Sequence, residues 1–144
     1  MKRIAILGST GSIGTSALDV ARTHRERVEV VAIAAATNVA AMVKQILEFR
    51  PRAVAMATGE AMDKLRAALG GSPAEISGVG NEGLCEIASH PDVDIVLCAS
   101  SGTAALDAVL CAIEAGKTIA LDRDAIAAQA DRLGLFVVGL DSTP

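Results

Sequence analysis

The chain has 144 residues, with 13 basic and 17 acidic side chains that give a net charge of −4. Hydrophobic residues make up 51% of it but aromatic residues only 1%, so it has neither the aromatic platforms nor the basic surface of nucleic-acid binders. The length suits one domain with a sizeable core, and we expect a single domain over residues 1–144. We also expect no membrane partner and a cytoplasmic location, because no apolar run approaches the roughly 18 residues of a membrane span.

Short apolar runs alternate with segments of helical periodicity along the whole chain. This alternation predicts a three-layer, doubly wound α/β fold of the Rossmann type, with a mostly parallel sheet of six to seven strands. The predicted strands are Lys2–Leu7, Val28–Ala35, Arg52–Ala57, Ala74–Ser77, Asp94–Ala99, Thr118–Leu121 and Leu135–Leu140. The predicted helices are Gly11–Thr23, Val39–Phe49, Glu60–Leu69, Asn81–Ser89, Thr103–Ala115 and Asp124–Leu133.

Two local patterns refine the helices. Asn38 precedes the second predicted helix and is a suitable N-cap, and Pro51 stops that helix. In the first predicted helix, helical spacing selects one apolar stripe that we expect to face the core. The residues of this stripe are Ile13, Ala17, Val20 and Ala21.

The chain has three cysteines, which is an odd number that fits no complete disulfide framework. Cys85, Cys98 and Cys111 also lack the spacing of metal ligands. Cys98 and Cys111 lie in apolar runs, so we interpret them as small core residues.

A glycine-rich segment, Leu-Gly-Ser-Thr-Gly-Ser-Ile-Gly at residues 7–14, joins the first predicted strand to the first predicted helix. Glycines let the backbone approach a pyrophosphate, and the start of a helix offers free N–H groups and a positive dipole end. The order strand, glycine turn, helix therefore favours a dinucleotide phosphate site, with a tight turn lacking any ligand as the alternative. The residues predicted to contact the cofactor here are Gly8, Thr10, Gly11, Ser12, Ile13 and Gly14.

The end of the second predicted strand reads Ala36, Thr37, Asn38 and lacks the acidic residue that binds the adenosine ribose in NAD-dependent folds. Without a carboxylate to repel a 2′-phosphate, NADP(H) is favoured over NAD. No arginine or lysine stands there to clamp that phosphate, and Asn38 acting only as a helix cap is the competing interpretation.

Two further loops follow predicted strands and should face the same crevice. Ser100, Ser101 and Gly102 are placed to contact the nicotinamide half, unless they form an ordinary turn and helix start. The segment Asp122-Arg123-Asp124 follows the strand Thr118–Leu121, so we expect Asp122 to contact the cofactor. In the competing interpretation, Asp124 is simply an acidic residue that complements the dipole of the next helix.

Several stretches resemble the N-terminal NADPH-binding domain of 1-deoxy-D-xylulose 5-phosphate reductoisomerases. They are Ile6–Gly14, Leu18-Asp19-Val20, the segment Glu-Phe-Arg-Pro-Arg at residues 48–52, and Ala-Gly-Lys-Thr-Ile at residues 115–119. This resemblance implies a Rossmann-type domain that binds NADP(H), from a family that reduces and rearranges a sugar phosphate with NADPH and a divalent metal in isoprenoid biosynthesis. It covers essentially residues 1–121.

The chain also departs from the family pattern. The basic anchor after the second strand is replaced by Ala36 and Thr37, and Thr143 stands where a metal-binding carboxylate is expected. The resemblance thus implies a cofactor-binding domain without the catalytic and metal-binding part, with an altered C-terminal segment, and inactive alone. Self-association into a homodimer is compatible with exposed apolar surface left by a missing domain.

Three alternatives stay open at this point. The chain is a complete small NAD(P)-dependent oxidoreductase, an engineered or fragment scaffold that keeps the fold without binding a cofactor, or the N-terminal half of a semialdehyde-dehydrogenase-like protein, which has a similar first turn. Turnover by the pure chain would select the first alternative, and the absence of any nucleotide binding would select the second.

Overall fold

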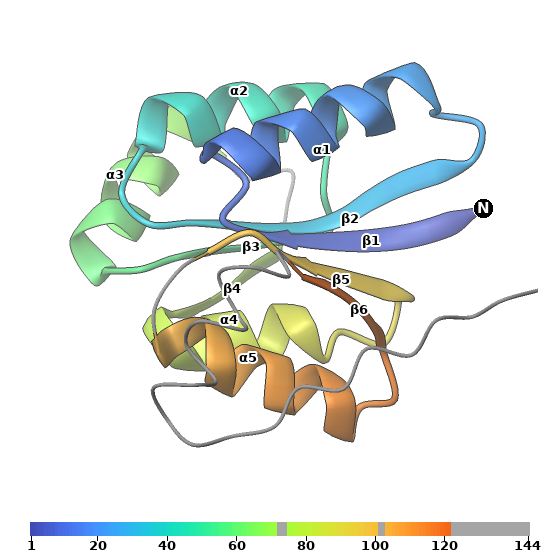
Figure 1. Ribbon diagram of the computed structural model, residues 1–144. Coiled ribbons are helices and arrows are strands. Elements are labelled where there is room, and N and C mark those ends of the chain that lie inside the picture. Colours follow the sequence, from blue (N-terminus) through green and yellow to red (C-terminus); the bar gives the residue numbers. More distant parts are fainter. Residues whose placement is uncertain (72–74, 101–102, 122–144) are drawn as a thin grey trace, which may run out of the picture.

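The computed structural model describes residues 1–71, 75–100 and 103–121 (Figure 1). The strands in this part are β1 (Lys2–Leu7), β2 (Val28–Ala35), β3 (Ala53–Met56), β4 (Glu75–Val79), β5 (Ile95–Cys98) and β6 (Thr118–Leu121). The helices are α1 (Ser12–Thr23), α2 (Val39–Phe49), α3 (Gly59–Leu69), α4 (Gly80–Ala88) and α5 (Thr103–Glu114). The predicted helix Asp124–Leu133 and strand Leu135–Leu140 lie outside the described residues.

The strands of the described part form one sheet in the order β4-β3-β2-β1-β5-β6, and every pairing is parallel. Helices α1, α2 and α3 cover one face, and α4 and α5 cover the other (Figure 1). The direction of strand addition reverses between β1 and β5, whose last residues Leu7 and Cys98 pair. This confirms the predicted doubly wound Rossmann-type fold and places its topological switch point beside the glycine-rich turn.

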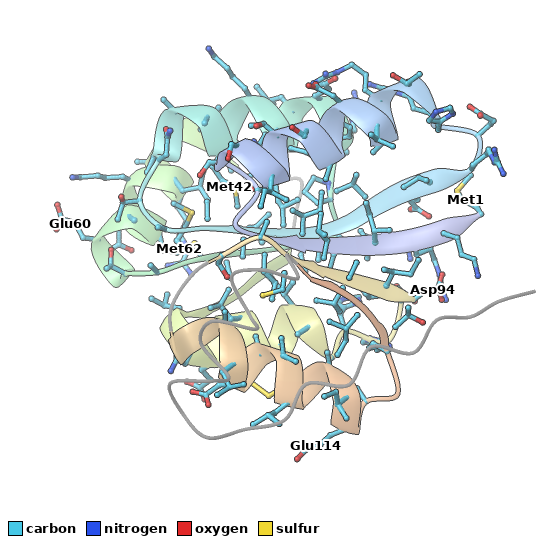
Figure 2. The ribbon with its side chains drawn as sticks, in the orientation of Figure 1. Met1, Met42, Glu60, Met62, Asp94 and Glu114 are labelled. Carbon is cyan, nitrogen blue, oxygen red and sulfur yellow. A yellow bond between two sulfur atoms is a disulfide. The ribbon has the colours of Figure 1, made fainter. Side chains whose placement is uncertain are left out.

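Short aliphatic side chains and methionines fill the two layers between sheet and helices. Along β1, Ala5 and Leu7 face α4 and α5, whereas Ile6 faces α1 and α2. Met42 of α2 and Met62 of α3 are fully buried under the upper helices (Figure 2). Unbranched methionine side chains adapt to gaps that aromatic rings fill in other cores, so the aromatic-poor composition still yields a closed interior.

The predicted core stripe of α1 is correct for Ala21, which is buried, and for Ala17, which packs partly buried against the core, but it is wrong for Ile13 and Val20. Gly14, Leu18 and Ala21 face the sheet, whereas 40% of Ile13 and 58% of Val20 are exposed. The glycine at residue 14 has to touch the turn before the helix, and this contact sets the rotation of α1 about its axis. Hydrophobic periodicity cannot detect it, because a glycine contributes nothing to an apolar stripe.

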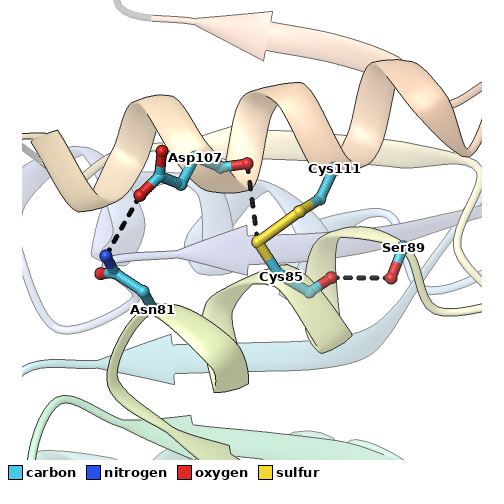
Figure 3. The surroundings of a disulfide bond; sticks show 5 residues. All are labelled: Asn81, Cys85, Ser89, Asp107 and Cys111. Carbon is cyan, nitrogen blue, oxygen red and sulfur yellow. Dashed lines mark hydrogen bonds between the residues drawn. A yellow bond between two sulfur atoms is a disulfide. The ribbon is translucent and has the colours of Figure 1, made fainter.

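The cysteine interpretation is correct for Cys98 and wrong for Cys111. Cys98 is buried and free, but Cys85 of α4 and Cys111 of α5 form a disulfide with their Cα atoms 5.5 Å apart (Figure 3). An odd number of cysteines excludes only complete pairing. The two that pair are 26 residues apart, and the chain topology alone makes α4 and α5 neighbours.

No helix in the described part of the chain combines the length and the apolar character that crossing a bilayer requires.

The amino-terminal ends of β1 and β5 are joined by an ion pair near the surface. Asp94 accepts from the backbone N–H of Arg3 at 2.9 Å, and its other carboxylate oxygen accepts from the Arg3 guanidinium at 2.9 Å (Asp94 is labelled in Figure 2). These bonds to Arg3 lower the pKa of Asp94 to about 2.

The Asp94 pair predicts a pH dependence of stability. The pKa of Asp94 is lower in the folded chain than in the unfolded one, so its contribution is complete above about pH 4 and is lost as the pH falls toward 2. We expect Asp94→Asn to flatten the pH dependence of the free energy of unfolding in this window, measured by urea titration. An unchanged slope in Asp94→Asn would contradict this assignment.

Candidate functional site

The turn between β1 and α1 holds three strand ends together. The N–H groups of Gly8 and Ser9 both donate to the Ala34 carbonyl at the end of β2, each at 2.8 Å. Gly8 has a φ of +85°, and a Cβ there would lie 2.9 Å from the backbone of Ala99 and Ser100 after β5. Gly8 is therefore needed for its left-handed backbone and for the approach of the segment after β5.

Gly14 and Gly11 have different roles in this turn. A Cβ on Gly14 would lie 2.6 Å from the Ser9 Cα and closer still to the Gly8 carbonyl oxygen, so α1 rests directly on the turn. A Cβ on Gly11 would meet only the Gly8 carbonyl oxygen, at an ordinary 3.6 Å. Gly11 is the exposed N-cap of α1 with extended backbone angles, so the space in front of it is open.

The first turn of α1 presents unpaired donors to that open space. Within the described residues, no acceptor is found for the backbone N–H groups of Ser12, Ile13 and Gly14, and no side chain caps the helix. The Thr15 N–H makes the first helical bond, to the Gly11 carbonyl at 2.9 Å. Free N–H groups at the positive end of a helix dipole form a site for an anion.

A buried polar pair that the sequence did not reveal fixes the turn onto α2. The Ser9 hydroxyl donates to the Gln45 Oε1 at 2.7 Å, and the Gln45 Nε2 donates to the Ser9 carbonyl at 3.0 Å. Ser9 is fully buried and Gln45 nearly so. The only sequence signal is a glutamine on the apolar face of a helix, which no periodicity assigns to a partner 36 residues away.

We expect Gln45→Leu to lower the free energy of unfolding by roughly 2–3 kcal/mol, because it leaves the Ser9 carbonyl buried without a partner and the Ser9 hydroxyl with only the weak Met42 sulfur acceptor at 3.8 Å. Ser9→Ala is the matched control. It removes the hydroxyl with its contacts to Gln45 and Met42, keeps the bond to the Ser9 carbonyl, and should cost about 1 kcal/mol. Urea denaturation measures both, and equal losses in the two variants would contradict this role of Gln45.

Ala36, Thr37 and Asn38 follow β2 and are exposed at the same end of the sheet as the turn. The Asn38 Oδ1 accepts from the Ala41 N–H at 3.1 Å, which confirms the predicted N-cap of α2. The cap occupies the side-chain oxygen of Asn38, and its amide NH₂ group has no acceptor within the described part of the chain.

Ser100 follows β5 at the switch point. The Ala99 N–H donates to the Leu7 carbonyl at 2.8 Å, which holds this segment against the end of β1. The Ser100 Oγ is buried and has no hydrogen-bond partner among the described residues. A buried hydroxyl without a partner is uncommon and fits a ligand group. Of the other predicted contacts, Ser101, Gly102 and Asp122 lie outside the described residues.

Sequence comparison places these features in a family. The profile of the 1-deoxy-D-xylulose 5-phosphate reductoisomerases matches residues 4–124. The enzyme of that name from Geobacillus sp. (strain WCH70) is 46% identical over 121 residues, which are 84% of this chain and 31% of the relative. The one from Geotalea uraniireducens (strain Rf4) is 44% identical over 139 residues, 96% of this chain and 36% of the relative.

Solved structures give the same result. The reductoisomerase from Zymomonas mobilis in complex with NADPH superposes with a TM-score of 0.81 at 32% identity, covering 92% of this chain and 34% of that one. A reductoisomerase in complex with NADPH, fosmidomycin and magnesium has a TM-score of 0.77 at 33% identity, covering 99% of this chain and 37% of that one. This chain spans about a third of the length of its curated relatives, and it belongs to the 1-deoxy-D-xylulose 5-phosphate reductoisomerase family.

Proposed function

We propose that this chain binds NADP(H) at the carboxyl ends of β1, β2 and β5. The observation that carries this proposal is the set of unpaired N–H groups at the start of α1, in front of an exposed Gly11. The residues fit a dinucleotide, because these donors suit a pyrophosphate and the buried Ser100 hydroxyl lacks a partner. The relatives solved with NADPH share this fold at 32–33% identity, which supports the choice of ligand.

Each predicted contact has a place in this proposal. The segment from Gly8 to Gly14 holds the pyrophosphate, and the segment from Ala36 to Asn38 faces the adenosine ribose. Ser100, with Ser101, Gly102 and Asp122 as further contacts, borders the nicotinamide half. When bound, the cofactor supplies a hydride. The chain's own residues bind and orient it.

We further propose that the chain contributes cofactor binding to the reductoisomerase reaction and catalyses nothing by itself. It spans 31% of the Geobacillus relative, and an isolated binding domain buries less of a ligand than a closed cleft. No basic side chain stands among residues 36–38, so we expect weak affinity. We also propose that the chain is cytoplasmic and forms a homodimer. We propose no nucleic-acid partner, because the net charge is −4.

Calorimetric titration of the purified chain with NADPH and NADH tests the proposal. We expect one NADPH per chain and weaker binding of NADH. The absence of any binding heat with both nucleotides at millimolar concentration would overturn the proposal. Absorbance at 340 nm with sugar phosphates as substrates tests the non-catalytic part, and oxidation of NADPH by this chain alone would contradict that part.

The choice of NADP over NAD predicts the effect of a carboxylate at residue 38. Asn38→Asp keeps an N-cap for α2 but places a negative charge where the 2′-phosphate is proposed to lie. We expect its affinity for NADPH to fall about tenfold or more, with little loss for NADH, since like charges in contact cost several kcal/mol. Asn38→Ser is the uncharged control that retains a cap, and an equal loss for both nucleotides in Asn38→Asp would contradict the placement.

A further inference from the structure

Helices α4 and α5 are joined by two polar or covalent links. The first is the Cys85–Cys111 disulfide, and the second is a hydrogen bond from the Asn81 Nδ2 to the Asp107 Oδ2 at 3.1 Å. Figure 3 shows both links along one side of α5, with the disulfide one turn beyond the hydrogen bond. Neither link belongs to the candidate cofactor site.

Helix α5 is held only lightly by the sheet itself. Among its described side chains, at residues 105–114, the buried ones are the alanines at 105, 108 and 112, and Val109 packs partly buried against the same core, whereas 50% of Leu110 and 57% of Ile113 are exposed. Because each alanine buries a single methyl group, apolar burial holds α5 less firmly than a helix anchored by leucine or methionine. The disulfide to α4 therefore adds a covalent link to a helix that buries mostly alanine side chains.

The reduced form also fits this site. The Asp107 carbonyl oxygen lies 3.5 Å from the Cys85 Sγ, so a thiol at Cys85 has an acceptor in place. Cys85 and Cys111 are both partly exposed, which leaves the pair open to a reagent, whereas the third cysteine, Cys98, is buried. Reduction leaves the Asn81–Asp107 bond intact, so α4 and α5 stay together without the covalent link.

We propose that Cys85 and Cys111 form a reversible thiol–disulfide site whose state sets how firmly α5 is attached. The reaction partner is a dithiol, either a small molecule or a protein with a paired cysteine motif. One thiolate of the dithiol attacks a sulfur of the pair, and the other cysteine leaves as a thiolate and takes up a proton. The second thiol of the dithiol then displaces the first cysteine, giving two cysteine thiols and the oxidised dithiol.

The effect of this site on the cofactor rests on the proposed function. Helix α5 begins at Thr103, close in sequence to Ser100, which is proposed to border the nicotinamide half of the cofactor. A less firmly attached α5 should therefore disturb this part of the cofactor site. The pyrophosphate turn is held separately, by the Ala34 carbonyl and by Gln45. Reduction should therefore weaken binding of the nicotinamide end and spare binding of the phosphates.

The experiment compares air-oxidised protein with protein reduced by dithiothreitol. Mass spectrometry after alkylation should find Cys85 and Cys111 blocked only in the reduced sample. Reduction should lower Tm by roughly 5–15 °C, reversibly on reoxidation, because the disulfide closes a loop of 26 residues. Hydrogen exchange should rise in α5 and spare α1 and α2. An unchanged Tm and exchange pattern, loss of all protection on reduction, or free thiols at both Cys85 and Cys111 in the oxidised sample would overturn the proposal.

The double variant Cys85→Ser/Cys111→Ser is the matched control, and neither its Tm nor its exchange should respond to dithiothreitol. Titrations of both states with NADPH and with 2′-phospho-ADP-ribose, which lacks the nicotinamide, test the coupling. We expect reduction to lower the affinity for NADPH about fivefold and to leave the affinity for 2′-phospho-ADP-ribose unchanged. Equal NADPH affinity in the two states would overturn the coupling. If neither nucleotide binds in either state, the proposed function fails, while the exchange result still decides the redox site.

Discussion

Gly14→Ala is expected to destabilise the fold by more than about 4 kcal/mol, which is a large part of the stability of a typical domain. The added Cβ would lie 2.6 Å from the Ser9 Cα and 2.8 Å from the Ser9 carbonyl carbon. Both are backbone atoms of a turn that is held by the Ala34 carbonyl and by Gln45, so neither can move aside cheaply. Urea denaturation followed by circular dichroism measures the loss.

Gly59→Ala is the matched control for this variant. Gly59 begins α3, and a Cβ there meets nothing within 4 Å. Alanine also restricts the unfolded chain more than glycine, so the control should be neutral or more stable by up to about 1 kcal/mol. If Gly14→Ala lost no more stability than Gly59→Ala, α1 would not rest on the turn as the structure places it.

Gly11→Val is expected to leave the chain folded while lowering its affinity for NADPH by about tenfold or more. The N-cap backbone at residue 11 is extended, with φ −78° and ψ 176°, so a β-branched residue adopts it without strain. The Cβ lies 3.6 Å from its nearest neighbour, and the rest of the side chain projects over the open first turn of α1. It would occupy the space that a pyrophosphate needs beside the free N–H groups.

Calorimetry with NADPH measures the loss in Gly11→Val, and the thermal unfolding temperature checks that the fold survives. Gly11→Ala adds a single methyl group and should lose less affinity than Gly11→Val. Undiminished NADPH binding by a folded Gly11→Val chain would refute the phosphate site. Together, Gly14→Ala and Gly11→Val separate the roles of two glycines of one motif. The fold requires a residue without a side chain at position 14, and the proposed phosphate site requires one at position 11.

Local sequence determined most of the elements. The predicted bounds of β1, β2, α2 and β6 agree with the structure, and the capping role of Asn38 is confirmed. The remaining described elements differ from their predicted bounds by one or two residues. These features depend on neighbours within a few positions: an apolar run, a side chain that caps the following turn, or a proline that ends a helix.

Contacts between distant segments were decided by the tertiary structure. The bond between Ser9 and Gln45 spans 36 residues and the pairing of Cys85 with Cys111 spans 26, so both require strands that lie far apart in the chain to be placed first. The sequence by itself determined the fold class, the elements and the place of the glycine turn, because periodicity and backbone preferences act locally. Only the tertiary structure decided which face of α1 is buried, which cysteines pair and what holds the turn, because each depends on the strand order β4-β3-β2-β1-β5-β6.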